Sequence, residues 1–499
     1  MQPEPFTTAR LGKPPSERFV EHALRAQLNY ARHNFYEYCA VDKAHTVMLI
    51  ERDIVTKAQG GNILALLTEI EQLGPDRFPM DPKFDSFLLQ VERYMIERIG
   101  EDTAGRMHTG RSRIDHDAAV ERLHARNRLL VVIRYMLDLQ DTILSLASNH
   151  AGTIMPGYTH LQHAQPWTFG HYLLRFADVF ARDLARLEGT FARTNLSSLG
   201  GAALAGTSWP LDRERTAQLL GHDGIVPNAH DAGCFSPDFS LENAAVLSIY
   251  VNNLGRLAGD LYVWHTWEFG FVELSDDYCG TSSIMPQKKN ADSLEMVRGW
   301  AGQAIGWLPC ALGTLKAATS TDCDNDFVGD IMHQASDVAW RATDLMNGAL
   351  ETMTVHAGRM RERAGANWST ANNLADTLVR QCDLSFRTAH HVVGRLVRLA
   401  VSEGIPPQEV GAALLDRAAM ETINRRLGVS QKLIADALDP AQFVRSRRTK
   451  GSVHPQEVEA LLRAGREKLA SHRAWYTAKH TQIEAAKQML QAEVSRYAQ

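Results

Sequence analysis

The sequence has 499 residues, of which 44% are hydrophobic and 22% are charged, and its formal net charge is −5. This composition is typical of a soluble globular protein with several structural layers or domains, and without a basic run it predicts no nucleic-acid partner. No stretch approaches the roughly 18 to 20 consecutive apolar residues that a membrane-spanning helix needs, so no membrane partner is expected either.

The N-terminal residues 1–19 have no apolar core after a basic start, so they do not resemble a secretory signal, and their prolines predict an extended arm. The six cysteines, at positions 39, 234, 279, 310, 323 and 382, form no CxxC pair and have no regular spacing. We interpret them as isolated buried thiols of a cytoplasmic protein.

Helical periodicity dominates the chain and predicts an all-α fold. Apolar residues recur every three or four positions in four long segments, at 117–150, 167–195, 239–271 and 292–318. We expect an N-terminal helical domain at 1–107 with a break at the Gly-Gly pair 60–61, a central long-helix bundle at 108–355, and a C-terminal helical domain at 356–499 with a basic loop at 446–457.

The central helices are apolar around much of their circumference, as in VVIRYMLDL at 131–139 and AAVLSIYVNNL at 244–254. A helix with this pattern needs neighbours on several sides. We therefore predict that the bundles of several chains associate into a homo-oligomer.

Two short polar segments interrupt the helical pattern at 108–116 and 156–166. In the first, Arg111, Ser112 and Arg113 can hold an anion, or they can form a solvated turn before a helix. In the second, Thr159 and His160 lie in a proline-bounded loop, where the histidine can act as a general acid or be a structurally bonded surface residue. No metal-ligand spacing and no phosphate-binding glycine motif is present, so neither a metal nor a nucleotide is expected.

A third polar segment, SDDYCGTSSIMPQKKNADS at 275–293, points more specifically to chemistry. It combines a permissive glycine, adjacent hydroxyls, two cations and an amide donor, namely Gly280, Ser282, Ser283, Lys288, Lys289 and Asn290. A serine becomes a useful base only if cations and N–H groups stabilise its alkoxide, and a carbanion beside a carboxylate needs similar help.

Six motifs carry a family resemblance. The run GTSSIMPQKKNADSLEMVRG at 280–299 resembles the signature loop of the aspartase/fumarase superfamily, and its double lysine resembles the argininosuccinate lyase branch. The same branch is matched by HTGRSR at 108–113, PGYTHLQHAQP at 156–166, GGAALAGTSWPLDRERTAQLLG at 200–221, EFGFVELSD at 268–276 and LADTLVR at 374–380. The resemblance extends over about residues 20–465.

This resemblance implies a three-domain, all-α protein whose long central helices form a twenty-helix bundle in a homotetramer, with each active site drawn from three subunits. The implied reaction is the anti elimination of fumarate from a succinyl-substituted group through an aci-carboxylate intermediate. No metal or organic cofactor is implied.

The family's roles transfer to matching positions in this sequence. Ser282 would be the base, Lys288 and Asn290 would stabilise the aci-carboxylate, and Thr159 and His160 would bind substrate and assist the leaving amine. Ser112 and Arg113 would hold the other carboxylate. The remaining implied substrate-binding positions are Ile114, Gln165, Ser283 and Met285, with Gln27 and Asp322 on the amine side.

The sequence departs from the branch mainly where the amine is held. Ile114 replaces an asparagine of the SRND motif, and Ala291 replaces the usual proline. Aligned positions that carry Ser and Asp in the branch are Gln27 and Ala31 here, those that carry Tyr, Gln and Lys are Asp322, Phe327 and Asp330, and an arginine position is Pro237. These changes reverse the local charge. Alternatively, the aspartates at 322–326 form the N-cap and first turn of a helix.

Three functions are open at this point. The favoured one is a carbon–nitrogen lyase that reversibly releases fumarate from an N-succinyl amine, with an amine specificity like that of ethylenediamine-disuccinate (EDDS) lyase. The second is argininosuccinate lyase, which releases arginine and fumarate. The third is a catalytically silent, crystallin-like structural homologue.

Overall fold

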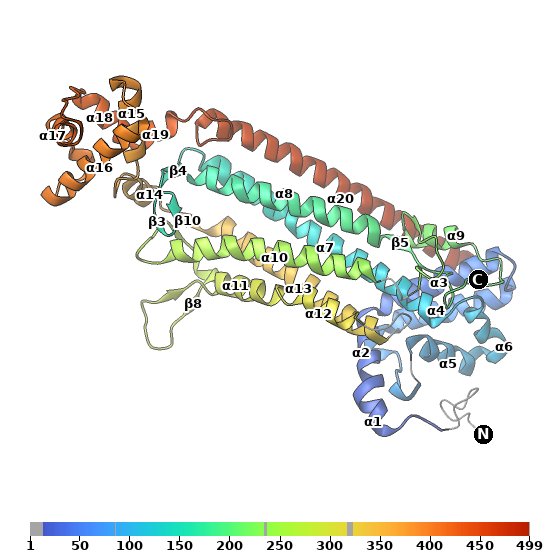
Figure 1. Ribbon diagram of the computed structural model, residues 1–499. Helices are drawn as coiled ribbons and strands as arrows, with labels where there is room; N and C mark the ends of the chain where they lie inside the picture. Colours follow the sequence, from blue (N-terminus) through green and yellow to red (C-terminus); the bar gives the residue numbers. More distant parts are fainter. Residues whose placement is uncertain (1–12, 85, 234–236, 317–322, 499) are drawn as a thin grey trace.

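The fold was analysed in a computed structural model that describes residues 13–84, 86–233, 237–316 and 323–498. It is an elongated, almost entirely helical molecule, with small helical regions at the two ends of a long bundle (Figure 1). This confirms the predicted all-α fold. Within the described residues no helix is long and apolar enough to cross a membrane.

The bundle combines the longest helices of the chain with two shorter ones. It contains α7 (Arg113–Asn149), α8 (Phe169–Thr194), α10 (Asp238–His265), α11 (Asp292–Ala304), α12 (Trp307–Thr314), α13 (Cys323–Thr352) and the returning C-terminal helix α20 (Pro455–Tyr497). Their apolar faces share one large core, in which Phe176, Tyr250 and Leu254 are almost completely buried. Burial of this shared surface stabilises the long helices far more than their intrinsic propensity does.

The N-terminal region packs around its own apolar core beside the start of α7 (Figure 1). Its helices are α1 (Glu17–Phe19), α2 (Arg25–His33), α3 (Phe35–Glu51), α4 (Lys57–Arg77), α5 (Phe87–Ile99) and α6 (Glu101–Ala104), with a π-helical turn at Val20–Leu24 and 3-10 turns at Pro82–Phe84 and Gly105–His108. The helix α9 (Arg213–Leu220) contacts α3 and α20 next to this region.

At the opposite end, a third apolar core joins four short helices. The helices of this region are α14 (Ala357–Ala364), α15 (Ala371–Cys382), α16 (Phe386–Glu403), α17 (Ala412–Ile423), α18 (Gln431–Leu438) and α19 (Pro440–Arg445), with a 3-10 turn at Pro407–Glu409. After this region the chain turns back, and α20 runs along α7 and α8 to the N-terminal end (Figure 1).

The described strands are two residues long and occur in pairs. Four pairs are antiparallel: β1 (Ile154–Met155) with β4 (Trp167–Thr168), β2 (Tyr158–Thr159) with β3 (Gln162–His163), β7 (Val272–Glu273) with β10 (Thr354–Val355), and β8 (Gly280–Thr281) with β9 (Lys289–Asn290). The strand β5 (Leu196–Ser197) pairs with β6 (Gly224–Ile225) in parallel. Two of these pairs, β2–β3 and β8–β9, hold predicted site residues.

Two local predictions were wrong. Gly60 and Gly61 do not break a helix but lie inside α4, where a Cβ on Gly61 would approach the carbonyl oxygen of Tyr497 to 2.3 Å. The expected helix at 292–318 is interrupted between α11 and α12, because Pro309 clashes with a continuous helix one turn earlier and the Ser248 hydroxyl donates to the Ala304 carbonyl.

The four described cysteines whose side chains are defined are unpaired. Cys39 and Cys382 are buried as expected, whereas Cys279 is half-buried and Cys310 is exposed, so the prediction of buried thiols was wrong for Cys310.

Candidate active site

The predicted site residues fall into three groups at different places on one chain. The first lies where α2, α7 and α13 begin or end beside the N-terminal region, and the other two lie near the opposite end of the bundle (Figure 1). The 37 residues of α7 alone separate the first two groups by about 55 Å, at 1.5 Å per residue.

The first group begins at the N-terminus of α7. The Ser112 hydroxyl accepts from the backbone N–H of Ile114 (3.3 Å), and the Asp115 carboxylate accepts from the N–H of Ser112 (2.8 Å), which forms a capping box. The other oxygen of Asp115 accepts from the N–H of Gly200 (2.8 Å). Asp115 thereby fixes the loop that carries Ser112 and Arg113.

A buried ion pair next to Ser112 supports the same loop from inside the protein. The side chains of Arg111, Asp42 and His116 are completely buried; Arg111 Nη1 donates to Asp42 Oδ1 (2.6 Å), and His116 Nε2 lies 2.9 Å from the same oxygen. Although burial opposes ionisation, Arg111 and His116 lower the pKa of Asp42 to about 2. The guanidinium of Arg111 is therefore buried in an ion pair that supports the loop, and it does not lie in the solvated turn that the sequence also allowed.

The amine-side positions gather at the junction of α2 and α13. Gln27 Nε2 donates to Asp326 Oδ2 (2.9 Å), and Asp324 and Asp326 lie in the first turn of α13. The expected helix start is therefore present, as the structural alternative for these aspartates required, yet Asp326 also faces Gln27. Asp322 lies outside the described residues.

Four other amine-side departures are more scattered. Ala31 is buried in the N-terminal core, Pro237 is the N-cap residue of α10, and Phe327 and Asp330 are exposed on α13. Ile114 occupies the first turn of α7 next to Arg113.

The second group occupies the β2–β3 hairpin. Its two turn residues, His160 (φ 55°) and Leu161 (φ 59°), both adopt the left-handed conformation that non-glycine residues rarely accept. Thr159, His160 and Gln165 are exposed, and Leu161 is 76% exposed. The hairpin thus presents a histidine and an apolar side chain in a strained turn to the outside of the protomer.

The third group forms the loop between β8 and β9, which projects from the bundle (Figure 1). The hydroxyl of Ser282 accepts from the N–H groups of Met285 (3.0 Å) and Ile284 (3.4 Å). At the base of the loop, a Cβ on Gly280 would lie 1.8 Å from Asp292 Oδ2, so only glycine admits this close approach.

The two lysines of this loop differ in their surroundings. Lys288 Nζ donates to Asn290 Oδ1 (2.5 Å), whereas Lys289 Nζ contacts Glu273 (3.0 Å) and Asp276 (2.7 Å). Burial slightly opposes the charge of Lys289, but these two carboxylates prevail and raise its pKa. Lys289 therefore fastens the loop to its base, and Lys288, Ser283 and Met285 remain exposed.

Three contributions were not found from the sequence. The capping pattern Ser112-x-x-Asp115 could have been recognised from its spacing, but the ion pair between Asp42 and Arg111 joins residues 69 positions apart and has no sequence signal. Glu121, on α7 two turns beyond Arg113, lines a small pocket, but in the sequence it looks like an ordinary charged helix position. Among the described residues no group of His, Cys, Asp or Glu has a metal-binding arrangement.

Comparison with known proteins identifies the family. Residues 24–306 match the model of the lyase family, and residues 368–445 match that of the argininosuccinate lyase C-terminal domain. The chain is 39% identical to the argininosuccinate lyase of Methanococcoides burtonii (93% of each chain covered) and 37% identical to that of Methanocaldococcus jannaschii (96% and 98%).

Solved structures agree with this assignment. EDDS lyase in complex with formate superposes with a TM-score of 0.87 at 34% identity, over 98% of this chain and 97% of that one. Class II fumarase from Schistosoma mansoni, at 13% identity and a TM-score of 0.68 over 82% and 90%, shares the fold. With its motifs, helical architecture and full-length relatives in agreement, the chain belongs to the argininosuccinate lyase branch of the aspartase/fumarase superfamily and is a carbon–nitrogen lyase.

Proposed function

We propose that this protein reversibly eliminates fumarate from an N-succinyl amine other than argininosuccinate, and that the amine carries a positive charge. The observation that carries this proposal is the acidic character of the amine side, where Asp324 and Asp326 open α13 and Asp326 contacts Gln27. A cationic amine would be stabilised there, whereas the carboxylate of arginine would face like charge.

The chemistry would begin at Ser282. Two backbone N–H groups already point at its hydroxyl oxygen, and such donors favour an alkoxide. The alkoxide would take the proton from the succinyl Cβ, and the electron pair would move into the adjacent carboxylate as an aci-carboxylate. Lys288 and Asn290 would stabilise that charge.

Collapse of the aci-carboxylate would then break the C–N bond. The electron pair of that bond would leave on nitrogen, which takes up a proton with the help of His160, so that fumarate and the free amine result. Thr159, Gln165, Ser283 and Met285 would line the substrate, while Ser112 and Arg113 would hold its second carboxylate. No metal or organic cofactor takes part in this scheme.

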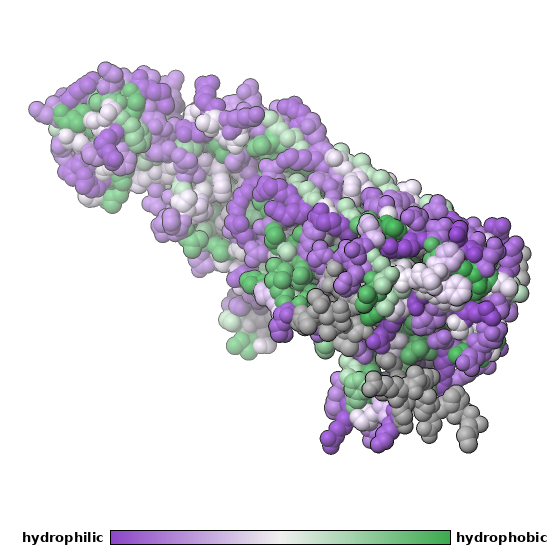
Figure 2. Space-filling view, turned by 45° about the vertical axis from the view of Figure 1, so that its right-hand side comes forward, coloured by the Kyte–Doolittle hydropathy of each residue, from purple (hydrophilic) through white to green (hydrophobic). Residues whose placement is uncertain are grey.

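The site requires more than one chain, and we propose a homotetramer with the central helices in a shared twenty-helix bundle. Apolar side chains on α10, α11 and α12 are exposed in the single protomer, including Ile249, Met296 and Leu312. Ile305, which caps the end of α11, is 66% exposed. Figure 2 shows apolar surface interrupting the polar one over the middle of the molecule. Exposed apolar area of this kind marks an interface.

The direct test is a panel of amines mixed with fumarate and purified protein, with the loss of fumarate absorbance as the measurement. We expect consumption with at least one diamine and none with the Ser282→Ala variant. Absence of consumption with every amine, together with rapid cleavage of argininosuccinate, would contradict the proposal.

Argininosuccinate lyase is the second candidate, because the full-length relatives cited above carry that name. Release of arginine and fumarate from argininosuccinate, at a rate above that of any diamine adduct, would favour it. A crystallin-like silent protein is the third, and it would bind fumarate without turning over any amine adduct.

A further inference from the structure

A small pocket lies one helical turn inward from the contact between Gln27 and Asp326. Its end is formed by Tyr30, three residues after Gln27 on α2, and by Gly329, three residues after Asp326 on α13. A Cβ on Gly329 would lie 2.1 Å from the Tyr30 hydroxyl, so glycine allows the ring to approach the helix. The pocket thus continues the amine side of the proposed site into the bundle.

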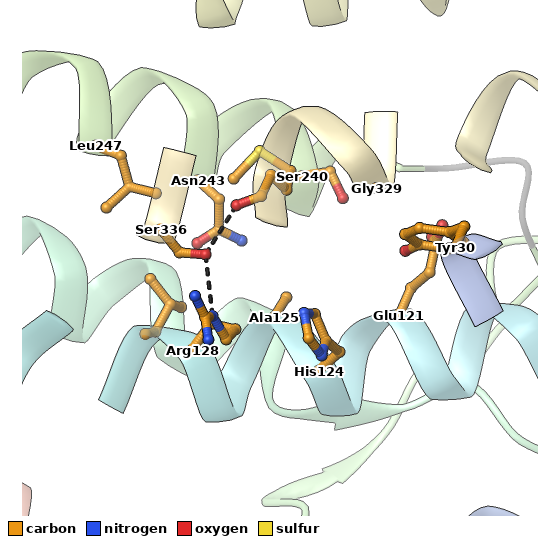
Figure 3. A pocket seen from close by; sticks show the side chains of 12 residues that line it. Tyr30, Glu121, His124, Ala125, Arg128, Ser240, Asn243, Leu247, Gly329 and Ser336 are labelled. Carbon is orange, nitrogen blue, oxygen red and sulfur yellow. Dashed lines mark hydrogen bonds between the residues drawn. The ribbon is translucent and has the colours of Figure 1, made fainter. Parts of the chain in front are cut away.

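The walls of this pocket come from α7, α10 and α13 (Figure 3). Glu121 projects from α7 next to Tyr30, and Ser240 and Asn243 project from α10 on the other side. Its volume is about 30 Å³, enough for a small polar group rather than a ring.

The donors that face the pocket already have partners. Arg128 Nε donates to the hydroxyl of Ser336 (3.2 Å). Arg128 Nη2 pairs with the carboxylate of Asp337 by charge, without hydrogen-bond geometry. His124 lies between Glu37 (3.7 Å) and His333 (3.3 Å).

By contrast, a hydrogen-bond acceptor that lines the pocket has no partner among the described residues. Asn243 is only 1% exposed, and its amide nitrogen donates to Thr194 and to the Phe239 carbonyl. Its amide oxygen has no hydrogen-bond partner within the described part of the chain. Burial, and then the carboxylates of Asp326 and Asp117, hold the pKa of Glu121 well above its usual range. The amide oxygen of Asn243 is this buried acceptor, and the half-buried carboxyl group of Glu121 lies beside two carboxylates that outweigh the effect of Arg122. Both features favour a ligand that donates hydrogen bonds and carries positive charge.

We propose that this pocket binds the distal ammonium group of the leaving amine, with Glu121 as the residue that determines specificity for a diamine. The inference rests on the proposed function and narrows its substrate class. Glu121 lies eight residues beyond Arg113 on α7, about 12 Å along the helix axis, so the second nitrogen must be several carbon atoms from the first. An aliphatic α,ω-diamine such as butane-1,4-diamine meets this requirement, and ethylenediamine meets it less well.

The test compares butane-1,4-diamine with butylamine, which has the same carbon chain and one ammonium group. In the wild type we expect kcat/KM for addition to fumarate to be roughly 10- to 100-fold higher with the diamine, as one charge-assisted contact predicts. Glu121→Gln keeps the shape and should remove this preference, so that kcat/KM for butane-1,4-diamine falls to that for butylamine. The matched control is Asp138→Asn, an exposed carboxylate on the same helix, and it should keep the preference.

Calorimetry separates failure of this inference from failure of the proposed function. Binding of butane-1,4-diamine to the wild-type protein should release a proton from Glu121, seen as a buffer-dependent binding enthalpy, and Glu121→Gln should abolish the release. Turnover of diamines with an undiminished preference in Glu121→Gln would overturn the inference and leave the lyase function intact. Proton-linked diamine binding without any turnover would support the pocket and contradict the reaction. Neither binding nor turnover would overturn both.

Discussion

At the scale of single residues, the loop between β8 and β9 already has the geometry of an activated hydroxyl. The Ser282 oxygen accepts hydrogen bonds from two backbone N–H groups, and Lys288 lies within the same loop beside Asn290. We predict that Ser282→Ala lowers kcat by about 10²–10⁴-fold, because it removes the base without touching any core contact. Steady-state kinetics with the best amine measure this, and size-exclusion chromatography should show an unchanged assembly.

A second prediction concerns three histidines from three helices. His33 and His124 lie against His333, with ring centroids 4.3 and 5.5 Å from its own. Burial, then His33 and His124, with Arg128 and Arg341, lower the pKa of His333 to about 4, whereas the unfolded chain should titrate near 6.5.

The sign of the effect follows from proton binding. Between pH 6.5 and 4 the unfolded state binds the extra proton, so the stability due to neutral His333 is present above that window and is lost as the pH falls through it. We expect the urea midpoint to fall from pH 7 to pH 5 by less in His333→Gln than in the wild type. An equal fall in both proteins would contradict the assignment.

At the scale of elements, α20 ties the two ends of the molecule together. It carries Lys468, which contacts Asp178 on α8 (2.7 Å), and its end packs on α4. The two helices approach closely at Gly61, since an added Cβ would meet the Tyr497 carbonyl oxygen at 2.3 Å.

We therefore predict that Gly61→Ala lowers the stability of the fold by about 1–3 kcal/mol, because the backbone of α20 must move away. Thermal unfolding measures the change. The matched control is Gly394→Ala inside α16, where an added Cβ meets nothing within 4 Å and the greater helix propensity of alanine should leave the midpoint unchanged or raise it.

At the scale of the whole molecule, the three groups of site residues cannot meet within one chain. Ser112 and Arg113 lie at one end of α7, and the hairpin with His160 lies beyond its other end. The exposed apolar faces of α10, α11 and α12 offer the surface through which chains can bring these groups together.

Complementation between inactive variants tests this arrangement. Ser282→Ala and Arg113→Ala proteins, each inactive alone, should regain activity after they are denatured and refolded together. If one site takes Ser282 and Arg113 from different protomers, random mixing restores about one quarter of the sites. If both residues came from the same protomer, every site would contain one substitution and no activity would return.

Much of this protein was determined by local sequence. Repeats of apolar residues specified α7, α8 and α10, and capping residues such as Ser112 marked where helices begin. The polar segments at 108–116, 156–166 and 275–293 contain the residues to which we assign the chemistry. These signals can be recognised in the sequence because helix periodicity and capping depend on residues within one or two turns.

Only the tertiary structure decided the rest. It placed Gly60 and Gly61 inside a helix against α20, withdrew Arg111 from the solvent by pairing it with Asp42, and enclosed Glu121 and Asn243 in one pocket. Each of these facts depends on what a distant segment presents at the contact. Burial and the pairing of charges are non-local quantities, so no pattern in the neighbouring residues can reveal them.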